Sequence, residues 1–354
     1  MRNIAVLLIL LALLSASEQP RAETAPEWTI KIAAVGDIMM GTTYPEDSNY
    51  LPPYDGTTIL AGVKDPLAAA DITIGNLEGC LLNGGTPAKD CEDPASCYVF
   101  RSPEHYVGYL AEAGFDVMSL ANNHARDFGE EGMNRTRELL DSVGIKYSGL
   151  IGDVAKLEHD GKTIAVIAFA TYDGLYNLLD IPLAESIVAG WSAMADIVVV
   201  SFHGGIEGIA ALHVPDSMEV AYGEDRGELR KFARAVIDAG ADLVVGHGPH
   251  VPRGMEIYKN RLIAYSLGNF CTYAFFNLKA ERSLTCILTV ELTAEGELYR
   301  GRAVPVVQEL RGIPRLDEQN RVIPVLQRLS QSDFGDSAPF IGDDGLILHK
   351  LYER

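Results

Sequence analysis

The chain has 354 residues, of which 29 are Lys or Arg and 49 are Asp or Glu, so its net charge is −20 with His neutral. With 47% hydrophobic and 22% charged residues, the composition is that of a globular protein and excludes intrinsic disorder. The negative charge disfavours a nucleic-acid partner, because it repels a phosphate backbone over most of the surface.

The first residues have the features of a secretory signal. Arg2 precedes an apolar run at residues 4–14, and the small residues Ser15-Ala16-Ser17 follow it. The run is shorter than the roughly 20 residues that a membrane-spanning helix needs. We therefore expect residues 1–17 to be a signal peptide, cleaved near Ser17 or alternatively near Ala22. The mature protein would then be exported to the periplasm, the cell surface or the medium. The alternative is an uncleaved membrane tether.

After this segment, apolar runs and amphipathic stretches alternate along the chain. The helix expected at 102–113 opens with Ser102-Pro103-Glu104, which has N-cap chemistry and Pro at the first helical position. The apolar runs are too hydrophobic to be half exposed, so the pattern predicts an α/β sandwich with buried sheets. We expect residues after about 313 to form a surface appendage. The strands are expected at 29–35, 71–75, 115–121, near 145, and at 163–170, 196–202, 243–246, 261–270, 283–292 and 301–308, with the last two paired, and the helices at 102–113, 129–143 and 224–239.

The five cysteines are too few for a scaffold built on disulfides, but export would place them in an oxidising compartment. Cys80, Cys91 and Cys97 lie in a Gly-, Pro- and Asp-rich stretch typical of a loop. We expect one disulfide among these three, with Cys91–Cys97 preferred. Cys271 and Cys286 lie in apolar stretches and are either a cross-strand pair or two buried thiols.

Five of the expected strands end in side chains that can bind a metal. Taken singly, each of these residues could be a turn former or a solvated loop residue. The carboxyl ends of strands are where α/β folds assemble ligand sites, and carboxylate, amide and imidazole donors together suit Zn, Mn, Fe or Mg. Their recurrence at successive strand ends therefore predicts a metal site. The residues are Asp37, Glu78, Asn123-His124, His203, and His247 with His250.

Around these residues the sequence resembles the CapA family of bacterial capsule-synthesis, poly-γ-glutamate proteins, a branch of the calcineurin-like metallophosphoesterases. The resemblance covers residues 29–272 and implies a four-layer α/β/β/α sandwich, here residues 28–312, with a two-metal centre between the sheets. Residues 313–354 would be the appendage. The matching segments are Val35-Gly36-Asp37-Ile38-Met39, Gly75-Asn76-Leu77-Glu78, Ala121-Asn122-Asn123-His124-Ala125-Arg126-Asp127-Phe128-Gly129, His203-Gly204-Gly205-Ile206-Glu207, Gly246-His247-Gly248-Pro249-His250-Val251 and Tyr265-Ser266-Leu267-Gly268-Asn269-Phe270.

The same resemblance implies roles for individual residues. Glu78 matches a carboxylate that bridges the two metals, while His124 matches the acid that faces the leaving group and Asp127 could orient its ring. Asp37 and His250 would serve the first metal, and Asn123, His203 and His247 the second. Arg126, Glu207 and Asn269 are candidate substrate contacts.

The sequence departs from the wider superfamily at Met39, which stands where a His ligand is expected. A thioether is a poor ligand for a hard ion, so the first site has one nitrogen fewer. We expect one tightly held divalent ion, Zn, Mn or Fe, and a second that binds more weakly.

The function that these features imply is the synthesis, export, attachment or trimming of a γ-linked glutamate polymer, with hydrolysis of an amide or phosphoester bond at the metal centre. Because the polymer and the protein are both anionic, binding would need a local positive site from the metal with Arg101, Arg126 or Arg253. One alternative is a non-catalytic polymer-binding subunit of a membrane synthase complex. Another is a general periplasmic metallophosphoesterase.

Overall fold

The computed structural model describes residues 26–45, 50–88 and 98–350. The expected signal peptide, Cys91 and Cys97 lie outside these residues. Within them, no helix combines the length and the apolar character needed to cross a membrane.

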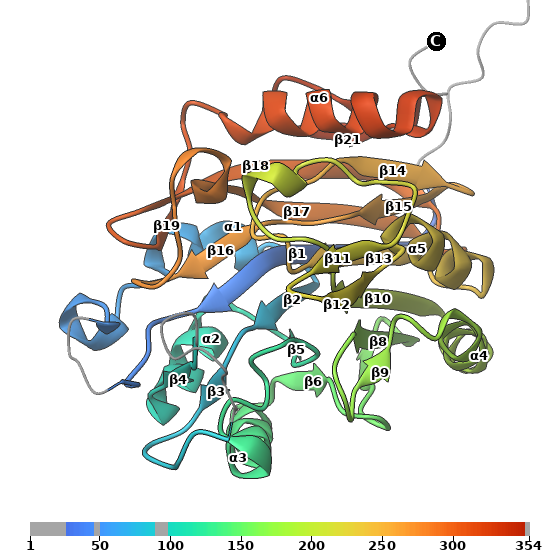
Figure 1. Cartoon of the computed structure of the whole chain (residues 1–354). Coiled ribbons are helices and arrows are strands. Elements are labelled where there is room, and N and C mark those ends of the chain that lie inside the picture. Colours follow the sequence, from blue (N-terminus) through green and yellow to red (C-terminus); the bar gives the residue numbers. More distant parts are fainter. Residues whose placement is uncertain (1–25, 46–49, 89–97, 351–354) are drawn as a thin grey trace, which may run out of the picture.

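Two large β-sheets form the framework of the molecule (Figure 1). In the first sheet, β1 is central, with the parallel strand β2 on one side, and on the other the antiparallel strand β17 along its first part and the parallel strand β16 along its end. Its strands, in spatial order, are β20 (Phe340–Ile341), β21 (Leu346–Leu348), β18 (Leu298–Glu309), β17 (Leu284–Thr293), β1 (Thr29–Met39), β2 (Ile72–Leu77), β5 (Val117–Ser119) and β6 (Lys146–Ser148), with β16 (Asn269–Thr272) paired to β1 and β19 (Ile313–Leu316) paired to β18.

The second sheet is also largely parallel at its centre, where β8, β10, β13 and β15 run in the same direction. Its order is β14 (Met255–Tyr258), β15 (Arg261–Ala264), β13 (Leu243–His247), β10 (Ile197–His203), β8 (Lys162–Ala170) and β7 (Ala155–His159), with β9 (Tyr176–Asn177) paired to β8. Two short pairs lie outside the sheets, β3 (Cys80–Leu81) with β4 (Arg101–Ser102), and β11 (Glu219–Ala221) with β12 (Glu224–Gly227).

Three apolar clusters define four layers. Ile32 and Ile74 of the first sheet pack against Val166 and Val199 of the second, so the sheets face each other across a common core. The outer face of the first sheet packs against α1 (Lys64–Ala68), α2 (Val107–Ala113) and α3 (Gly129–Ser142). The outer face of the second packs against α4 (Ile181–Ser192) and α5 (Leu229–Asp238). The expected α/β/β/α sandwich is confirmed.

Short 3-10 helices occupy several connections. They cover Pro53–Gly56, Ala61–Val63, Glu104–Tyr106, Ile209–Ala211, Ala280–Ser283 and Gly335–Ser337.

The C-terminal region differs from the expected surface appendage. Helix α6 (Val322–Phe334) places Val322, Ile323 and Leu326 in the core between the sheets, and β19, β20 and β21 extend the first sheet. In Figure 1, α6 lies along one end of the two sheets, where it covers their edge. The scattered apolar residues after residue 313 are thus one face of an amphipathic helix and parts of edge strands. This segment completes the core.

Most of the expected strands are present, but one predicted strand is divided into two in the structure. The apolar run 261–270 forms β15 in the second sheet and β16 in the first, and the chain crosses between the sheets at residues 265–268. Gly268 at the crossing has φ +70°, a left-handed conformation that ends the extended run. Periodicity could not reveal this break, because residues 262–270 are buried throughout.

Two helix starts also differ from the prediction. Residues 224–227 form strand β12, because Tyr222 and Gly223 both have positive φ and make a tight hairpin turn, so the helix begins only at Leu229. Ser102 is not an N-cap. It belongs to β4, and its hydroxyl donates to the Gly41 carbonyl at 2.6 Å.

Three cysteines are described, and each is a buried free thiol. Cys271 packs on the helical side of the first sheet and Cys286 between the sheets, which confirms the buried-thiol alternative for this pair. The thiol of Cys80 donates to the Phe100 carbonyl at 3.5 Å. The preferred Cys91–Cys97 bridge stays a prediction.

Candidate metal centre

The predicted site residues lie at the carboxyl ends of strands from both sheets. Asp37 is near the end of β1 and Glu78 directly follows the neighbouring strand β2. His203 and His247 are the last residues of β10 and β13 and lie opposite each other in register. Because the two sheets face each other, the carboxylates of one and the imidazoles of the other meet at the same end of the sandwich.

Three of these side chains form a compact buried cluster. One ligand atom from each of Asp37, Glu78 and His203 lies within 4.8 Å of the others. His203 Nδ1 is 3.5 Å from Glu78 Oε1. The two remaining histidines contact Asp37: His247 Nδ1 lies 3.4 Å from Oδ1, and His250 Nδ1 lies 2.9 Å from Oδ2.

Two glycines allow this convergence. A Cβ at Gly36 would lie 1.9 Å from the Gly268 carbonyl oxygen, so only glycine permits β1 to approach the crossing segment. The close approach lets the Asp37 N–H donate to that oxygen at 2.9 Å, and it fixes the backbone directly at the cluster.

Two asparagines from the matching segments, which were not among the predicted site residues, orient Asp37. Asn76 donates to Asp37 Oδ1 at 2.9 Å. Asn122 in turn donates to Asn76 Oδ1 at 3.0 Å and to the Leu77 carbonyl at 2.9 Å. Such outer hydrogen bonds hold a ligand in one orientation, so they belong to the site.

Burial and neighbouring charges shift the pKa values of three side chains in the cluster. Burial alone raises the pKa of Asp37, but contacts with His247 and His250 hold it below its ordinary value. Burial lowers the pKa of His203 well below its ordinary value, which favours the neutral imidazole that can bind a metal. Burial also lowers the pKa of His250, but the charges of Glu78 and Asp37 outweigh this effect and raise it to about 10.

The donor set fits a divalent ion. Buried polar atoms normally have hydrogen-bond partners. Here Asn123 Oδ1, His203 Nδ1 and both ring nitrogens of His247 are buried and make no hydrogen bond to a described residue. Carboxylate, amide and imidazole donors suit Zn, Mn or Fe. The buried Asp37–Glu78–His203 group could therefore hold a metal ion.

Met39 does not supply the missing nitrogen. Its side chain is fully buried, and its sulfur accepts a hydrogen bond from the Gly41 N–H at 3.3 Å. The thioether is thus engaged by the backbone of the following loop, and the weaker first site stays a prediction.

His124 and Asp127 are paired as expected. His124 Nδ1 lies 2.8 Å from Asp127 Oδ2, and the same oxygen accepts the Phe100 N–H at 2.7 Å. The Phe100 ring lies against the imidazole with a centroid distance of 4.2 Å. These contacts fix the orientation of the imidazole ring.

The candidate substrate residues are less uniform. The Arg126 side chain is 40% exposed and lies 3.9 Å from Glu130. Glu207 lies 3.8 Å from Arg226. Asn269 is opposite Asp37 in register, and its buried Oδ1 has no hydrogen-bond partner among the described residues, so it belongs to the cluster's surroundings.

The other two arginines considered for a positive site are structural. Arg101 donates hydrogen bonds to the Thr43 hydroxyl and to the Gly84 carbonyl. Arg253 is fully buried and forms an ion pair with Glu219. The cation beside the cluster is instead Arg226, which sequence reasoning missed because its segment was interpreted as a helix. The turn at Tyr222-Gly223 was the available signal.

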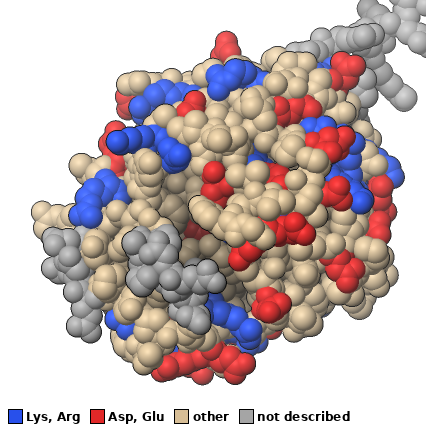
Figure 2. Space-filling model, viewed as in Figure 1, with Lys and Arg blue, Asp and Glu red and all other residues tan. Residues whose placement is uncertain are grey.

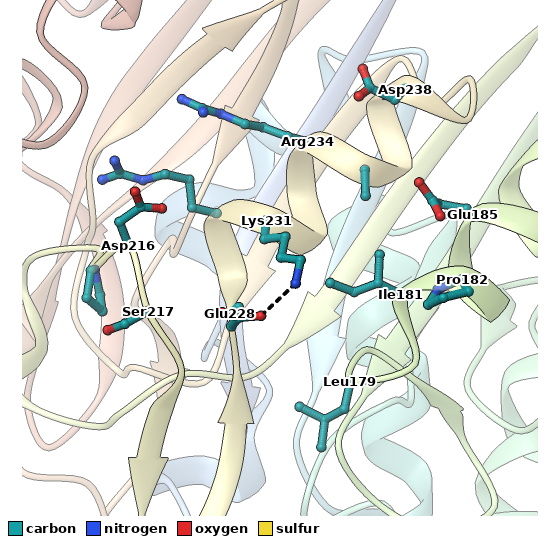
Figure 3. A pocket seen from close by; sticks show the side chains of 13 residues that line it. Leu179, Ile181, Pro182, Glu185, Asp216, Ser217, Glu228, Lys231, Arg234 and Asp238 are labelled. Atoms are coloured by element: carbon teal, nitrogen blue, oxygen red, sulfur yellow. Dashed lines mark hydrogen bonds and ion pairs between the residues drawn. The ribbon is translucent and has the colours of Figure 1, made fainter.

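A second concave region lies on the outer face, between α4 and α5 (Figure 3). It has a volume of about 730 Å³ and contains none of the predicted site residues. Several of its charged side chains have partners: Lys231 donates to Glu228 at 3.0 Å, and Asp238 pairs with Lys259. It is therefore separate from the candidate metal centre.

The fold and cluster define an α/β/β/α sandwich protein with a candidate metal centre at the strand ends. Residues 31–274 match the family described as "Bacterial capsule synthesis protein PGA_cap", and the chain belongs to this family.

The relatives agree with this assignment. The "PGA biosynthesis protein CapA" of Bacillus subtilis (strain 168) is 32% identical over 274 residues, covering 72% of this chain and 66% of that protein. The "Capsule biosynthesis protein CapA" of Bacillus anthracis is 30% identical, covering 68% of this chain and 59% of that protein. The chain thus spans less than two thirds of the length of these relatives.

Among solved structures, a candidate 5′-nucleotidase from Staphylococcus aureus, in complex with alpha-ketoglutarate, aligns with a TM-score of 0.46 and 14% identity. The alignment covers 86% of this chain and 58% of that one.

Proposed function

We propose that this protein acts in the biosynthesis of γ-linked glutamate polymer, and that its buried cluster binds a divalent metal and hydrolyses an amide bond of that polymer. The observation that carries the proposal is the convergence of Asp37, Glu78 and His203 with two further histidines at one end of a PGA_cap-family fold. Membership of this family supports the γ-linked glutamate polymer as the substrate, and the set of donor atoms supports metal binding at the cluster.

The chemistry would be divided between the ion and the chain. A bound divalent ion lowers the pKa of water and neutralises charge that develops on the attacked carbonyl group. The chain holds the site: Asn76 fixes the orientation of Asp37, and Asp127 fixes that of His124. When water adds to the carbonyl carbon and the carbon–nitrogen bond breaks, the departing nitrogen needs a proton, and His124 Nε2 would donate it.

The test is incubation of purified protein with γ-linked polyglutamate in the presence of Mn or Zn, with new amino groups measured over time. His124→Ala should lower turnover by about a hundredfold or more while leaving the metal content unchanged. His105→Ala is a control, because His105 is exposed and pairs with Asp55. A parallel loss of metal in His124→Ala would make His124 a ligand and contradict its role as an acid.

A second candidate function is non-catalytic binding of the polymer within a membrane synthase complex. The observation in its favour is Met39, whose sulfur is bonded to the Gly41 N–H where a metal-binding histidine would be expected. Saturable polymer binding, without turnover of either the polymer or a chromogenic phosphoester, would support this function over hydrolysis. Turnover of the phosphoester alone would support a general phosphoesterase.

We also propose export of the protein, on the basis of Arg2, the apolar run 4–14 and the small residues after it. N-terminal sequencing of protein from its native host should begin near Glu18 or Glu23. A sequence that begins at Met1 would instead support a tether.

A further inference from the structure

Arg226 lies on β12 beside the candidate metal centre. Its backbone carbonyl accepts a hydrogen bond from the N–H of Gly205 at 2.8 Å, and Gly205 follows His203 by two residues. Its guanidinium donates to the Tyr172 hydroxyl, and the Tyr172 ring centroid lies 6.5 Å from that of His203.

The guanidinium is buried but poorly satisfied. The Arg226 side chain is 6% exposed, and its Nε has no hydrogen-bond partner among the described residues. Its closest carboxylates are Glu224 at 3.3 Å and Glu207 at 3.8 Å, which are 57% and 25% exposed. Solvent reaches both carboxylates, so these pairs contribute little, and they leave the Nε donor of the guanidinium unused.

Arg253 shows what a structural arginine looks like in the same region. It is fully buried, and its three nitrogens donate to the Ala211 carbonyl at 2.6 Å, to the Ile206 carbonyl at 3.3 Å and to both oxygens of Glu219 at 2.8 and 2.7 Å. Among the described residues, the Arg226 side chain makes one comparable hydrogen bond, to Tyr172. The difference indicates that Arg226 is positioned for a partner that is not part of the protein.

The hairpin that carries Arg226 is fixed to the metal-site loops. Glu219, at the start of β11, forms an ion pair with Arg253 and accepts a hydrogen bond from the Ile206 N–H at 2.9 Å. Arg253 follows His250 by three residues, so one buried pair joins the hairpin to the loop of a candidate ligand. The position of Arg226 is thereby set relative to the cluster.

We propose that Arg226 binds a carboxylate of the ligand next to the metal centre. This inference rests on the proposed function, because each unit of a γ-linked glutamate chain keeps a free α-carboxylate. A guanidinium can bind a carboxylate through two parallel hydrogen bonds. An incoming carboxylate would displace the exposed Glu224 and engage the unused donors.

The surface around the site explains why such a residue is needed. Figure 2 shows a hollow near the centre of this face, with Asp and Glu side chains along the side where β11 and β12 lie. Glu224 and Asp225 on that hairpin are exposed. An anionic polymer is repelled at this rim, so its binding needs a buried positive charge within the site.

The test is calorimetric binding of a γ-linked glutamate pentamer to the full chain, with and without added Mn. Arg226→Gln should weaken binding about tenfold to a hundredfold, the effect of losing a charged hydrogen-bonding partner. Arg226→Lys should recover part of the loss, and Tyr172→Phe should weaken binding less than Arg226→Gln. Arg300→Gln, which removes the same charge at an exposed ion pair with Glu291, should bind like the wild type.

Thermal unfolding and metal content of Arg226→Gln should match the wild type, since Arg226 is not a ligand. If Arg226→Gln binds the pentamer as tightly as the wild type, the inference is wrong while the proposed function stands. If the wild type binds no pentamer, both fail. Inorganic phosphate and an α-linked pentamer are the remaining probes: binding of phosphate alone, lost in Arg226→Gln, would overturn the carboxylate assignment in favour of a phosphoester ligand.

Discussion

Polar residues lie at both ends of the parallel strands, but the two ends differ in whether the protein satisfies the hydrogen bonds of these residues. At the amino end, an aspartate precedes each of β2, β5, β10 and β13 and exchanges two hydrogen bonds with the backbone of the neighbouring strand. The pairs are Asp71 with Lys31, Asp116 with Thr73, Asp196 with Thr163 and Asp242 with Val198, and each carboxylate accepts the backbone N–H at 2.8 Å.

At the carboxyl end the corresponding side chains are not satisfied in this way. His203 Nδ1 and both ring nitrogens of His247 are buried and lack hydrogen-bond partners among the described residues. The same strand, β10, thus begins beside a fully bonded Asp196 and ends at His203. The comparison teaches that a polar residue next to a strand is structural where the adjacent backbone satisfies it, and a ligand candidate where the protein does not.

The sharpest test uses the two ends of β10. His203→Ala should remove the tightly bound ion, because it deletes one of the three clustered ligands. Even outer-shell changes cost metal affinity roughly 10–100-fold. Asp196→Asn, at the other end, should leave the metal content unchanged, since the amide oxygen can still accept the Thr163 N–H. Metal analysis of dialysed protein checks both variants, and equal metal loss in the two would remove the distinction.

The two halves of the metal centre should also differ from each other. The sequence predicts that Met39 stands in place of one nitrogen ligand of a first metal site, so the affinity of that site should be at least about 10–100-fold lower than that of the second. Dialysed protein should retain one equivalent of metal and take up another only when Mn or Zn is added. Two equivalents that survive dialysis would contradict this asymmetry.

Gly36→Ala tests whether the structure at the carboxyl ends of the strands depends on the close approach of β1 to Gly268. The new Cβ would lie 1.9 Å from the Gly268 carbonyl, and backbone cannot move aside as a flexible side chain can. We expect a loss of about 3 kcal/mol or more in the free energy of unfolding, the upper range for overpacking. Urea unfolding measures it, with Gly190→Ala as the control, because a Cβ there meets no atom within 4 Å.

The pH dependence of stability in Asp242→Asn tests the role of the buried aspartate at the amino end of β13. Burial raises the pKa of Asp242 to about 6, above its ordinary value of 3.8, so its ionisation costs stability as the pH rises through about 6. The full cost is about 3 kcal/mol at 1.36 kcal/mol per pH unit. The amide variant avoids this cost but gives up the contact with Arg261 at 3.4 Å. Its free energy of unfolding relative to wild type should therefore rise by about 1–2 kcal/mol between pH 5 and 8, and parallel pH profiles would refute the assignment.

The sequence predicted more of the site than of its surroundings. Asp37, Glu78, His203 and His247 could be assigned to one place because each follows a continuous apolar strand, and the ends of parallel strands converge. Arg226 could not, because a short hairpin strand of polar residues has no periodicity that distinguishes it from the first turn of a helix.

The sequence by itself determined most of the central strands of the two sheets, since burial on both faces of a sheet demands continuous apolar runs. It also determined the types of donor at the strand ends. Only the tertiary structure decided that residues 261–270 divide between two sheets, because the break at Gly268 depends on contact with Gly36. The tertiary structure likewise decided that α6 closes the core and that Arg226 faces the cluster, since both depend on contacts between segments distant in the chain.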